Sequence, residues 1–181
     1  MKKYVAHDKY VAFLRGINSG KNPTVKMEVL RKTFEDLGFE NVRTILASGN
    51  VLFESSTYEN TLEQKIEEVL PLAIGFQSEV IVRTIDDLHK LVLLNPFKAT
   101  EITTHIRPYV TFIKGKPNKN FRFPSGGKGY TILGIFNGAV CSVADLSDAK
   151  TPSLMQLLDK EFGKGITTRS WNTVERILKA S

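Results

Sequence analysis

The chain has 181 residues, of which 41% are hydrophobic and 24% are charged, and its net charge is +6. This is the composition of a folded globular protein, and the length suits one domain or two small ones. No apolar run approaches the roughly 20 residues of a membrane-spanning helix, and polar residues interrupt the N-terminal segment where a signal peptide needs an apolar core. We therefore expect a cytoplasmic protein without a membrane partner, and the single cysteine, Cys141, fits a reducing compartment.

The charge is unevenly distributed along the chain. Residues 1–94 carry 12 basic and 13 acidic side chains, whereas residues 95–181 carry 13 basic and 6 acidic ones. A basic second half is typical of proteins that bind an anionic partner, and a role in solubility explains it equally well.

The first half predicts an alternation of strands and helices. Runs of strand-forming residues and apolar residues at helical spacing indicate the two kinds of element. They predict a strand at 10–15, a helix around 27–37, strands at 41–46 and 51–54, a helix around 62–73 and a strand at 79–83. This β-α-β-β-α-β order is that of a ferredoxin-like, or split βαβ, unit.

The ends of these two helices carry local signals. Thr24 is the predicted N-cap of the first helix, and Ser56 with Glu59 predicts a capping box at the start of the second. Pro71 is expected to bend the second helix or end it early, because proline lacks the N–H that a helix interior uses.

The second half repeats this plan imperfectly after a short linking helix. The predicted elements are the linking helix at 85–94, strands at 108–114, 130–136, 139–143 and 165–169, and helices opening at Thr151-Pro152 and, with Asn172 and Glu175 as caps, near the C-terminus. A basic loop over 115–128 stands where the first helix would be. We therefore predict an α+β fold of two ferredoxin-like subdomains, residues 1–94 and 95–181, the second of them imperfect.

Two loops of the first half form the candidate site. In a β-α-β-β-α-β unit, the loop after the first strand and the turn between the second and third strands lie at the same end of the sheet. Here both contain glycine, amide and hydroxyl residues, and basic side chains add positive charge, a combination that favours an anion. The candidate ligand-binding residues are Arg15, Gly16, Asn18, Gly20, Lys21, Ser48, Gly49 and Asn50. The needs of loop geometry alone explain the same residue types.

Known catalytic motifs are absent from the sequence. Gly16 and Gly20-Lys21 are one residue too close together for a P-loop, and Asn22 stands where the magnesium-binding hydroxyl would be. No dinucleotide-binding fingerprint, zinc-binding motif or nucleophile elbow occurs. We therefore predict no cofactor and no metal.

The second half holds two further candidates. The basic loop over 115–128 places Phe121 and Phe123 among basic side chains, which suits a single-stranded nucleic acid, although a solvated loop with two anchoring phenylalanines is the simpler explanation. Near the C-terminus, Arg169, Trp171 and Asn172 are candidate ligand-binding residues, with Arg169 as the anion donor.

Several motifs together resemble a known family. They are Tyr10-Val-Ala-Phe-Leu-Arg-Gly-Ile-Asn18, Met27-x-x-Leu30, Gly38-x-x-x-Val42-x-Thr44, Ser48-Gly-Asn-Val51 with Phe53, and Thr167-Thr-Arg-x-Trp-Asn-Thr173. The combination is similar to the bacterial family called domain of unknown function 1697, nearly from end to end. The resemblance implies two ferredoxin-like subdomains and brings no established activity, cofactor or catalytic residue. The chain departs from the family pattern at Ser19, Lys21, Ile45, Ala47 and Ser170.

From these residues we expect a binding module for a phosphate-bearing ligand, such as a nucleotide or RNA. Its site would combine residues 15–22 and 48–50, with Arg169 and Trp171 facing them from the second half. Two alternatives stay open. One is an enzyme at the same cleft, which a contact of His105 with Ser48 or Asp145 would favour. The other is a structural or partner-binding protein that forms dimers by pairing sheet edges.

Overall fold

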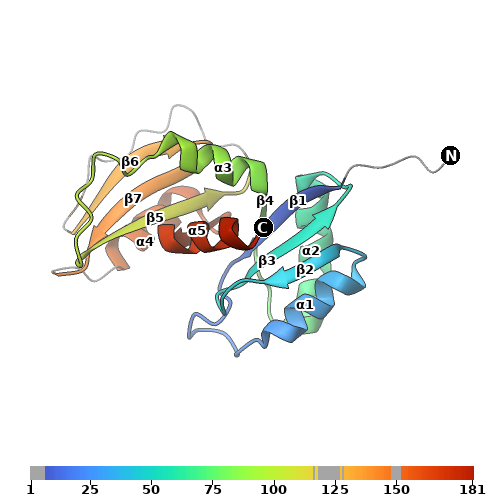
Figure 1. Ribbon diagram of the computed structural model, residues 1–181. Helices are drawn as coiled ribbons and strands as arrows, with labels where there is room; N and C mark the ends of the chain where they lie inside the picture. The colour runs from blue at the N-terminus through green and yellow to red at the C-terminus, as the bar shows by residue number, and fades with distance from the viewer. Residues whose placement is uncertain (1–6, 116, 118–126, 128, 148–151) are drawn as a thin grey trace. The chain divides into compact units, whose positions relative to one another are not determined.

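The computed structural model describes residues 7–115, 117, 127, 129–147 and 152–181, and the chain divides into two compact units. The first unit consists of residues 1–88 together with 176–181, and the second of residues 89–175 (Figure 1). The division therefore falls inside the linking helix, whereas the sequence predicted it after residue 94. The segment 176–181 belongs to the first unit, which the sequence did not predict.

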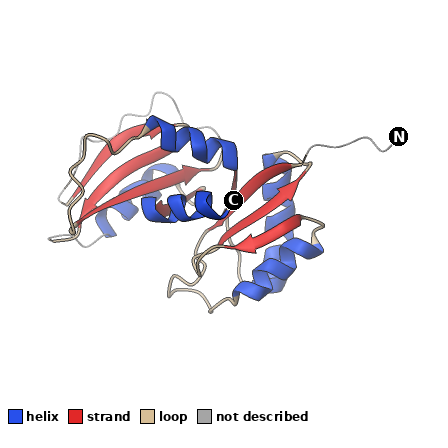
Figure 2. Ribbon diagram, in the orientation of Figure 1, coloured by secondary structure: helices blue, strands red, loops and turns tan. Residues whose placement is uncertain are grey.

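The first unit is a four-stranded sheet with two helices on one face (Figure 2). Its elements are β1 (Asp8–Leu14), α1 (Met27–Asp36), β2 (Glu40–Thr44), β3 (Asn50–Ser55), α2 (Glu59–Ile74) and β4 (Val80–Thr84). The strands are ordered β2-β3-β1-β4, and all neighbours are antiparallel. β2 and β4 are therefore the edge strands of this sheet.

The core of the first unit lies between the sheet and the two helices. Alternate residues of each strand point to the same face, and the helices bury residues that recur every three or four positions. The fully buried residues of this core include Ala12, Leu14, Leu30, Phe34, Val51, Leu62, Ile66, Leu70, Val80 and Val82. The Phe39 and Phe53 rings stack with centroids 4.6 Å apart. Burial of these side chains holds both helices on the sheet.

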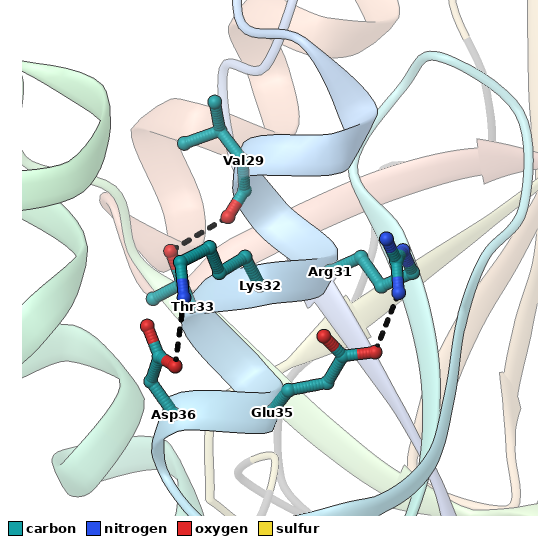
Figure 3. A network of polar contacts seen from close by, with 6 residues as sticks. All are labelled: Val29, Arg31, Lys32, Thr33, Glu35 and Asp36. Atoms are coloured by element: carbon teal, nitrogen blue, oxygen red, sulfur yellow. Dashed lines mark hydrogen bonds and ion pairs between the residues drawn. The ribbon is translucent and has the colours of Figure 1, made fainter.

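The outer side of α1 carries two ion pairs, each between residues one turn apart (Figure 3). Arg31 donates to Glu35 at 2.7 Å, and Lys32 donates to Asp36 at 3.2 Å. Such exposed i,i+4 pairs contribute only about 0.3–0.5 kcal/mol each. The apolar side of α1, rather than its charged side, therefore determines where the helix lies.

The predicted N-caps of α1 and α2 are wrong. The helices begin after Lys26 and Tyr58, and neither of these N-cap side chains makes a capping hydrogen bond. Ser56 is exposed. Glu59, its predicted partner in a capping box, instead accepts a hydrogen bond from the backbone of β4, as described below.

Pro71 does not end α2, so an early end of the helix is wrong, and a bend at Pro71 stays a prediction. The helix continues through Pro71 to Ile74 and ends at Gly75, which has a φ of 85° and whose N–H donates to the Pro71 carbonyl at 3.0 Å. A glycine in the left-handed region is the usual way to end a helix.

The second unit also contains a four-stranded antiparallel sheet, ordered β6-β7-β5-β8. Its strands are β5 (Ile106–Ile113), β6 (Tyr130–Phe136), β7 (Ala139–Asp145) and β8 (Ile166–Ser170), and its helix α4 spans Pro152–Phe162. Two further helices, α3 (Ile85–Leu94) and α5 (Trp171–Ala180), each extend across the division between the units. The predicted Asn137-Gly138 hairpin turn is present, with φ values of 44° and 77°. Of the segment between β5 and β6, the structure describes only residues 114, 115, 117, 127 and 129, so the imperfect character of this half stays a prediction.

The C-terminal helix begins two residues earlier than the predicted Asn172 cap implies. α5 starts at Trp171, so Asn172 lies inside its first turn and the predicted Asn172 cap is wrong. The Ser170 hydroxyl accepts the Thr173 N–H at 3.4 Å and therefore takes the capping position.

The chain is thus an α+β protein with two four-stranded antiparallel sheets and, in the described residues, five helices. No helix in this part of the chain has the length and apolar character that crossing a membrane requires.

Candidate functional site

The loop after β1 and the turn between β2 and β3 are joined by hydrogen bonds. The Leu14 N–H donates to the Gly49 carbonyl at 2.8 Å, and the Asn18 side chain donates to the Ala47 carbonyl at 2.9 Å. The two bends therefore share one rim of the first unit, as the sequence predicted.

Asn18 is the residue that connects the two bends. Its Nδ2 donates to the carbonyls of Val25, at 3.0 Å, and Ala47, while its Oδ1 accepts the Val25 N–H at 2.8 Å. Both amide hydrogens of Asn18 are thereby used inside the protein. Asn18 positions the rim, and its Nδ2 has no further hydrogen to offer a ligand.

Asn50 has a similar role within the turn. It is fully buried, and its Nδ2 donates to the Ile45 carbonyl at 2.8 Å and to the Ser48 hydroxyl at 3.1 Å. The Ile45 N–H donates to the Asn50 carbonyl at 2.8 Å, which closes the turn. The predicted site residue Asn50 is therefore a support for the turn.

Gly49 permits the close approach of the two bends. Its φ is 76°, and a Cβ at this position would lie 2.6 Å from Ile17 Cγ1 and 3.2 Å from Leu14 Cβ. Any larger residue would push the β2–β3 turn away from the loop after β1, so glycine is needed here for both conformation and space.

The backbone after β1 alternates in handedness. Gly16, Asn18 and Gly20 have φ values of 76°, 51° and 83°, whereas the residues between them are outside the positive region. Where right- and left-handed residues alternate, successive N–H groups turn toward one side and form a concave anion-binding nest, so this φ pattern marks the loop as a candidate nest. The Ser19 hydroxyl and the Asn22 amide donate to the Gly16 carbonyl at 3.2 and 3.1 Å and stabilise this curl.

Two basic residues flank the nest. Arg15 is fixed through its backbone, because its N–H donates to the Glu79 carbonyl at 2.9 Å and its carbonyl accepts the Ser78 hydroxyl at 2.8 Å. Lys21 is exposed on the loop itself. Ser48, at the tip of the facing turn, is also exposed. The loop thus combines positive φ at every second residue with two basic residues.

The predicted site residues near the C-terminus lie in the second unit. Arg169 is buried, and its Nη1 donates to the Thr167 hydroxyl at 2.7 Å and to the Thr168 carbonyl at 2.9 Å. Burial lowers the pKa of Arg169 to about 10, which leaves the guanidinium charged at neutral pH. Trp171 packs edge-on against Phe97 with ring centroids 5.0 Å apart. That these residues face the first unit's rim stays a prediction.

The structure gives little support to the side-chain arrangement that would favour an enzyme. Asp145 accepts hydrogen bonds from the hydroxyl and the N–H of Ser147, and these, with a smaller effect of the His105 charge, lower its pKa. A carboxylate with a lowered pKa is a poor general base near neutral pH. Ser48 belongs to the other unit.

Cys141 and the possible metal ligands are further candidate features of the sequence. Burial raises the pKa of the Cys141 thiol to about 12, so it is an inert core residue, as predicted. Among the described residues, no group of three histidine, cysteine, aspartate or glutamate side chains is arranged to hold a metal ion. Most of the predicted basic loop at 115–128, including Phe121 and Phe123, lies outside the described residues, as does Thr151.

Sequence reasoning missed a shallow hollow on the first unit. It is lined by Lys9, Tyr10, Asn41, Arg43, Leu52, Phe53, Glu54, Ile85 and Ser181. Inside it, Asn41 Nδ2 donates to Glu54 Oε2 at 3.0 Å. Because it mixes acidic and basic side chains, it is a less suitable anion site than the rim. Its residues come from five separate segments, and no local motif indicates that they meet.

Comparisons with known proteins place the fold but no activity. A family model described as "Protein of unknown function (DUF1697)" matches residues 8–122. The chain is similar to the solved structure of the conserved bacterial protein SP0830 from Streptococcus pneumoniae, at 21% identity and a TM-score of 0.73, covering 97% of this chain and 98% of that one. An unknown protein from Galdieria sulphuraria shows 14% identity and a TM-score of 0.29 over 91% of this chain and 99% of that one. Among curated proteins there is no significant match.

Proposed function

Because the chain belongs to the DUF1697 family of proteins of unknown function, we propose a function from the geometry of its first unit. The protein is a binding module for a phosphate-bearing ligand, a nucleotide or an RNA end, in the bacterial cytoplasm. The ligand binds at the rim formed by residues 15–22 and 48–50. We further propose that both units have the ferredoxin-like topology.

The observation that carries this proposal is the positive φ at every second residue of the loop, at Gly16, Asn18 and Gly20. A nest of backbone N–H groups recognises the oxygens of a phosphate without needing a catalytic side chain. The hydrogen bonds of Asn18 support this role, because they hold the curl in one conformation before a ligand arrives. A preorganised loop loses less entropy on binding than a loop that must first become ordered.

The flanking charges support the same ligand class. Arg15 and Lys21 add two positive charges to the rim, and Lys21 lies in the exposed part of the loop. A phosphate carries enough negative charge to gain from both, and the gain falls with added salt because the site is open to water. An enzyme is less well supported, because the candidate general base Asp145, in the second unit, is already hydrogen-bonded to Ser147.

Isothermal titration calorimetry with pyrophosphate, ATP and a short RNA tests this proposal. The RNA is supplied with a 5′-phosphate and with a 5′-hydroxyl, so that recognition of the terminal phosphate is separated from general affinity for RNA. We expect binding of at least one phosphate-bearing probe, and we expect Lys21→Ala to weaken it several-fold.

Lys65→Ala is the matched control, because it removes an exposed lysine from α2, outside the rim. Equal weakening by Lys21→Ala and Lys65→Ala would mean that only net charge matters and would overturn the site. The absence of heat with every probe would overturn the function.

A further inference from the structure

The edge strand β4 has a row of backbone N–H groups that its own sheet does not use. β4 pairs with β1 on one side only, and its register sets Val80 opposite Leu14 and Val82 opposite Ala12. In an antiparallel pair, alternate residues direct their N–H groups away from the partner strand. On β4 these are Val80, Val82 and Thr84, whose N–H groups we call the edge amides.

Three glutamates of α2, which we call the glutamate row, accept all three edge amides. The hydrogen bonds run from Val80 N to Glu67 Oε1 at 2.8 Å, from Val82 N to Glu63 Oε1 at 2.9 Å, and from Thr84 N to Glu59 Oε1 at 3.2 Å. The glutamate row therefore takes the place of a neighbouring strand, supplying side-chain acceptors where that strand would supply carbonyls.

The match between helix and strand is geometric. Four residues of a helix rise about 6 Å, and two residues of a strand rise about 6.8 Å, so glutamates spaced by four face amides spaced by two. Along α2 the glutamates advance while their partners on β4 recede, as expected when a helix and the strand that follows it run in opposite directions. The same helix buries Leu62, Ile66 and Leu70 in the core, which fixes the row beside the edge.

Burial of a carboxylate in the glutamate row is costly unless the carboxylate is well bonded. Glu63 is only 4% exposed, and taking a carboxylate out of water is unfavourable unless it is well bonded. Its Oε1 lies 3.8 Å from Arg83 Nη1 as well as accepting the Val82 N–H, so a charge and an amide together compensate the loss of water. A simple apolar helix face would not need this compensation.

The opposite edge of the sheet is protected in a different way. β2 carries an irregularity between Glu40 and Arg43, and Asn41 within it has a φ of 52°. A bulge and exposed charged side chains are known to discourage strand pairing. β4 has a regular register with β1, and its outward N–H groups are bonded to the glutamate row.

We propose that the glutamate row is an autoinhibitory contact, which occupies the edge amides of β4 and thereby prevents a strand of a second molecule from pairing with this edge. An unpaired row of N–H groups is a template for strand addition. Because the carboxylates already accept hydrogen bonds from the edge amides, these amides cannot donate to the carbonyls of an incoming strand. Those carbonyls would also meet the negative charge of the carboxylates. Removing the row exposes the template.

Amide hydrogen exchange of the full chain tests the contact itself. In the wild type, the edge amides exchange slowly, although they belong to an edge strand. In Glu63→Ala the Val82 amide exchanges about tenfold faster or more, with a smaller effect at Val80 and Thr84. Glu63→Gln keeps a side-chain oxygen acceptor, so the Val82 amide stays protected.

Glu67→Ala provides a second test if Glu63→Ala does not fold, because Glu67 is only half-buried and serves Val80. Glu68→Ala, an exposed neighbour on the same helix, is the control for loss of charge. Fast exchange of the edge amides in the wild type, or faster exchange over the whole unit without preference for the paired amide, would overturn the contact.

Sedimentation velocity over a range of concentrations tests the inhibition of pairing. A variant with alanine at positions 59, 63 and 67 self-associates more than the wild type, whereas the variant with glutamine at these positions does not. If the alanine variant is folded by circular dichroism and associates no more than the wild type, the edge is closed by something else and the proposal fails.

Discussion

Asn18 donates a hydrogen bond from its side chain to the carbonyl of Ala47 at 2.9 Å, across 29 positions of the sequence. This contact joins the loop after β1 to the β2–β3 turn and makes one rim out of two bends.

Replacing Asn18 should release the rim. Asn18→Ala removes three hydrogen bonds, two of them to Val25, and places alanine at a φ of 51°. We expect a loss of about 2 kcal/mol in the free energy of unfolding, measured by urea denaturation, together with faster exchange of the Val25 amide. Asn22→Ala, which removes one side-chain hydrogen bond to the Gly16 carbonyl, should cost about 1 kcal/mol or less. Equal losses in the two variants would contradict the special role of Asn18.

Alanine variants at Gly49 and Gly20 should separate the cost of backbone strain from the cost of steric crowding. Both have positive φ values, 76° and 83°, but a Cβ at Gly49 would lie 2.6 Å from Ile17 Cγ1, whereas at Gly20 nothing lies within 4 Å. Gly20→Ala should cost about 1 kcal/mol for backbone strain alone. Gly49→Ala should cost about 3 kcal/mol, because the turn must also move. Chemical denaturation of both variants decides this, and a Gly20→Ala variant as unstable as Gly49→Ala would refute the packing argument.

Glu59 should make the first unit less stable as the pH rises. Burial, the largest effect, and the charge of Asp87 raise the pKa of Glu59 above its ordinary value of 4.5, against the opposing effects of Arg83 and the Thr84 N–H. The fold therefore favours the protonated form, and this contribution is lost as the pH rises through the raised pKa. Glu59→Gln keeps an oxygen acceptor for Thr84 without the charge.

The melting temperature of Glu59→Gln, relative to the wild type, should therefore rise between pH 4 and pH 7, and the two proteins should converge at low pH. Glu68→Gln, at an exposed position of the same helix, is the control and should show no such trend. A relative stability of Glu59→Gln that falls over this range would mean that the carboxylate is favoured in the fold.

Cys141 should be unreactive in the folded protein. It is fully buried in β7, and its thiol has a pKa of about 12, so the thiolate is scarce at pH 8. A thiol reagent such as 5,5′-dithiobis(2-nitrobenzoate) should leave the native chain unlabelled and label one group per chain in denaturing urea. Rapid labelling without urea would show that β7 opens easily or that the thiol is accessible.

The order and kind of most elements could be predicted from local patterns. Apolar periodicity placed the six elements of the first unit within a few residues, and Asn137-Gly138 marked its hairpin turn correctly. The helix ends were predicted less well. The sequence around Ser56 and Glu59 fits a capping box, but the Glu59 carboxylate bonds instead to Thr84, 25 positions away. The capping box would have used the Glu59 carboxylate locally, but a distant backbone N–H binds this carboxylate instead.

The sequence by itself determined an α+β chain of two sheets, the shared end of two loops in the first unit, and an inert cysteine. These depend on periodicity, chain direction and residue type, which neighbouring residues specify. Only the tertiary structure decided that Asn18 and Asn50 support the rim from within, and that α2 covers the edge of β4 with carboxylates. The acceptors of Asn18 and the donors of the glutamate row are backbone groups. Every residue type carries such groups, so only the folded chain selects which of them meet.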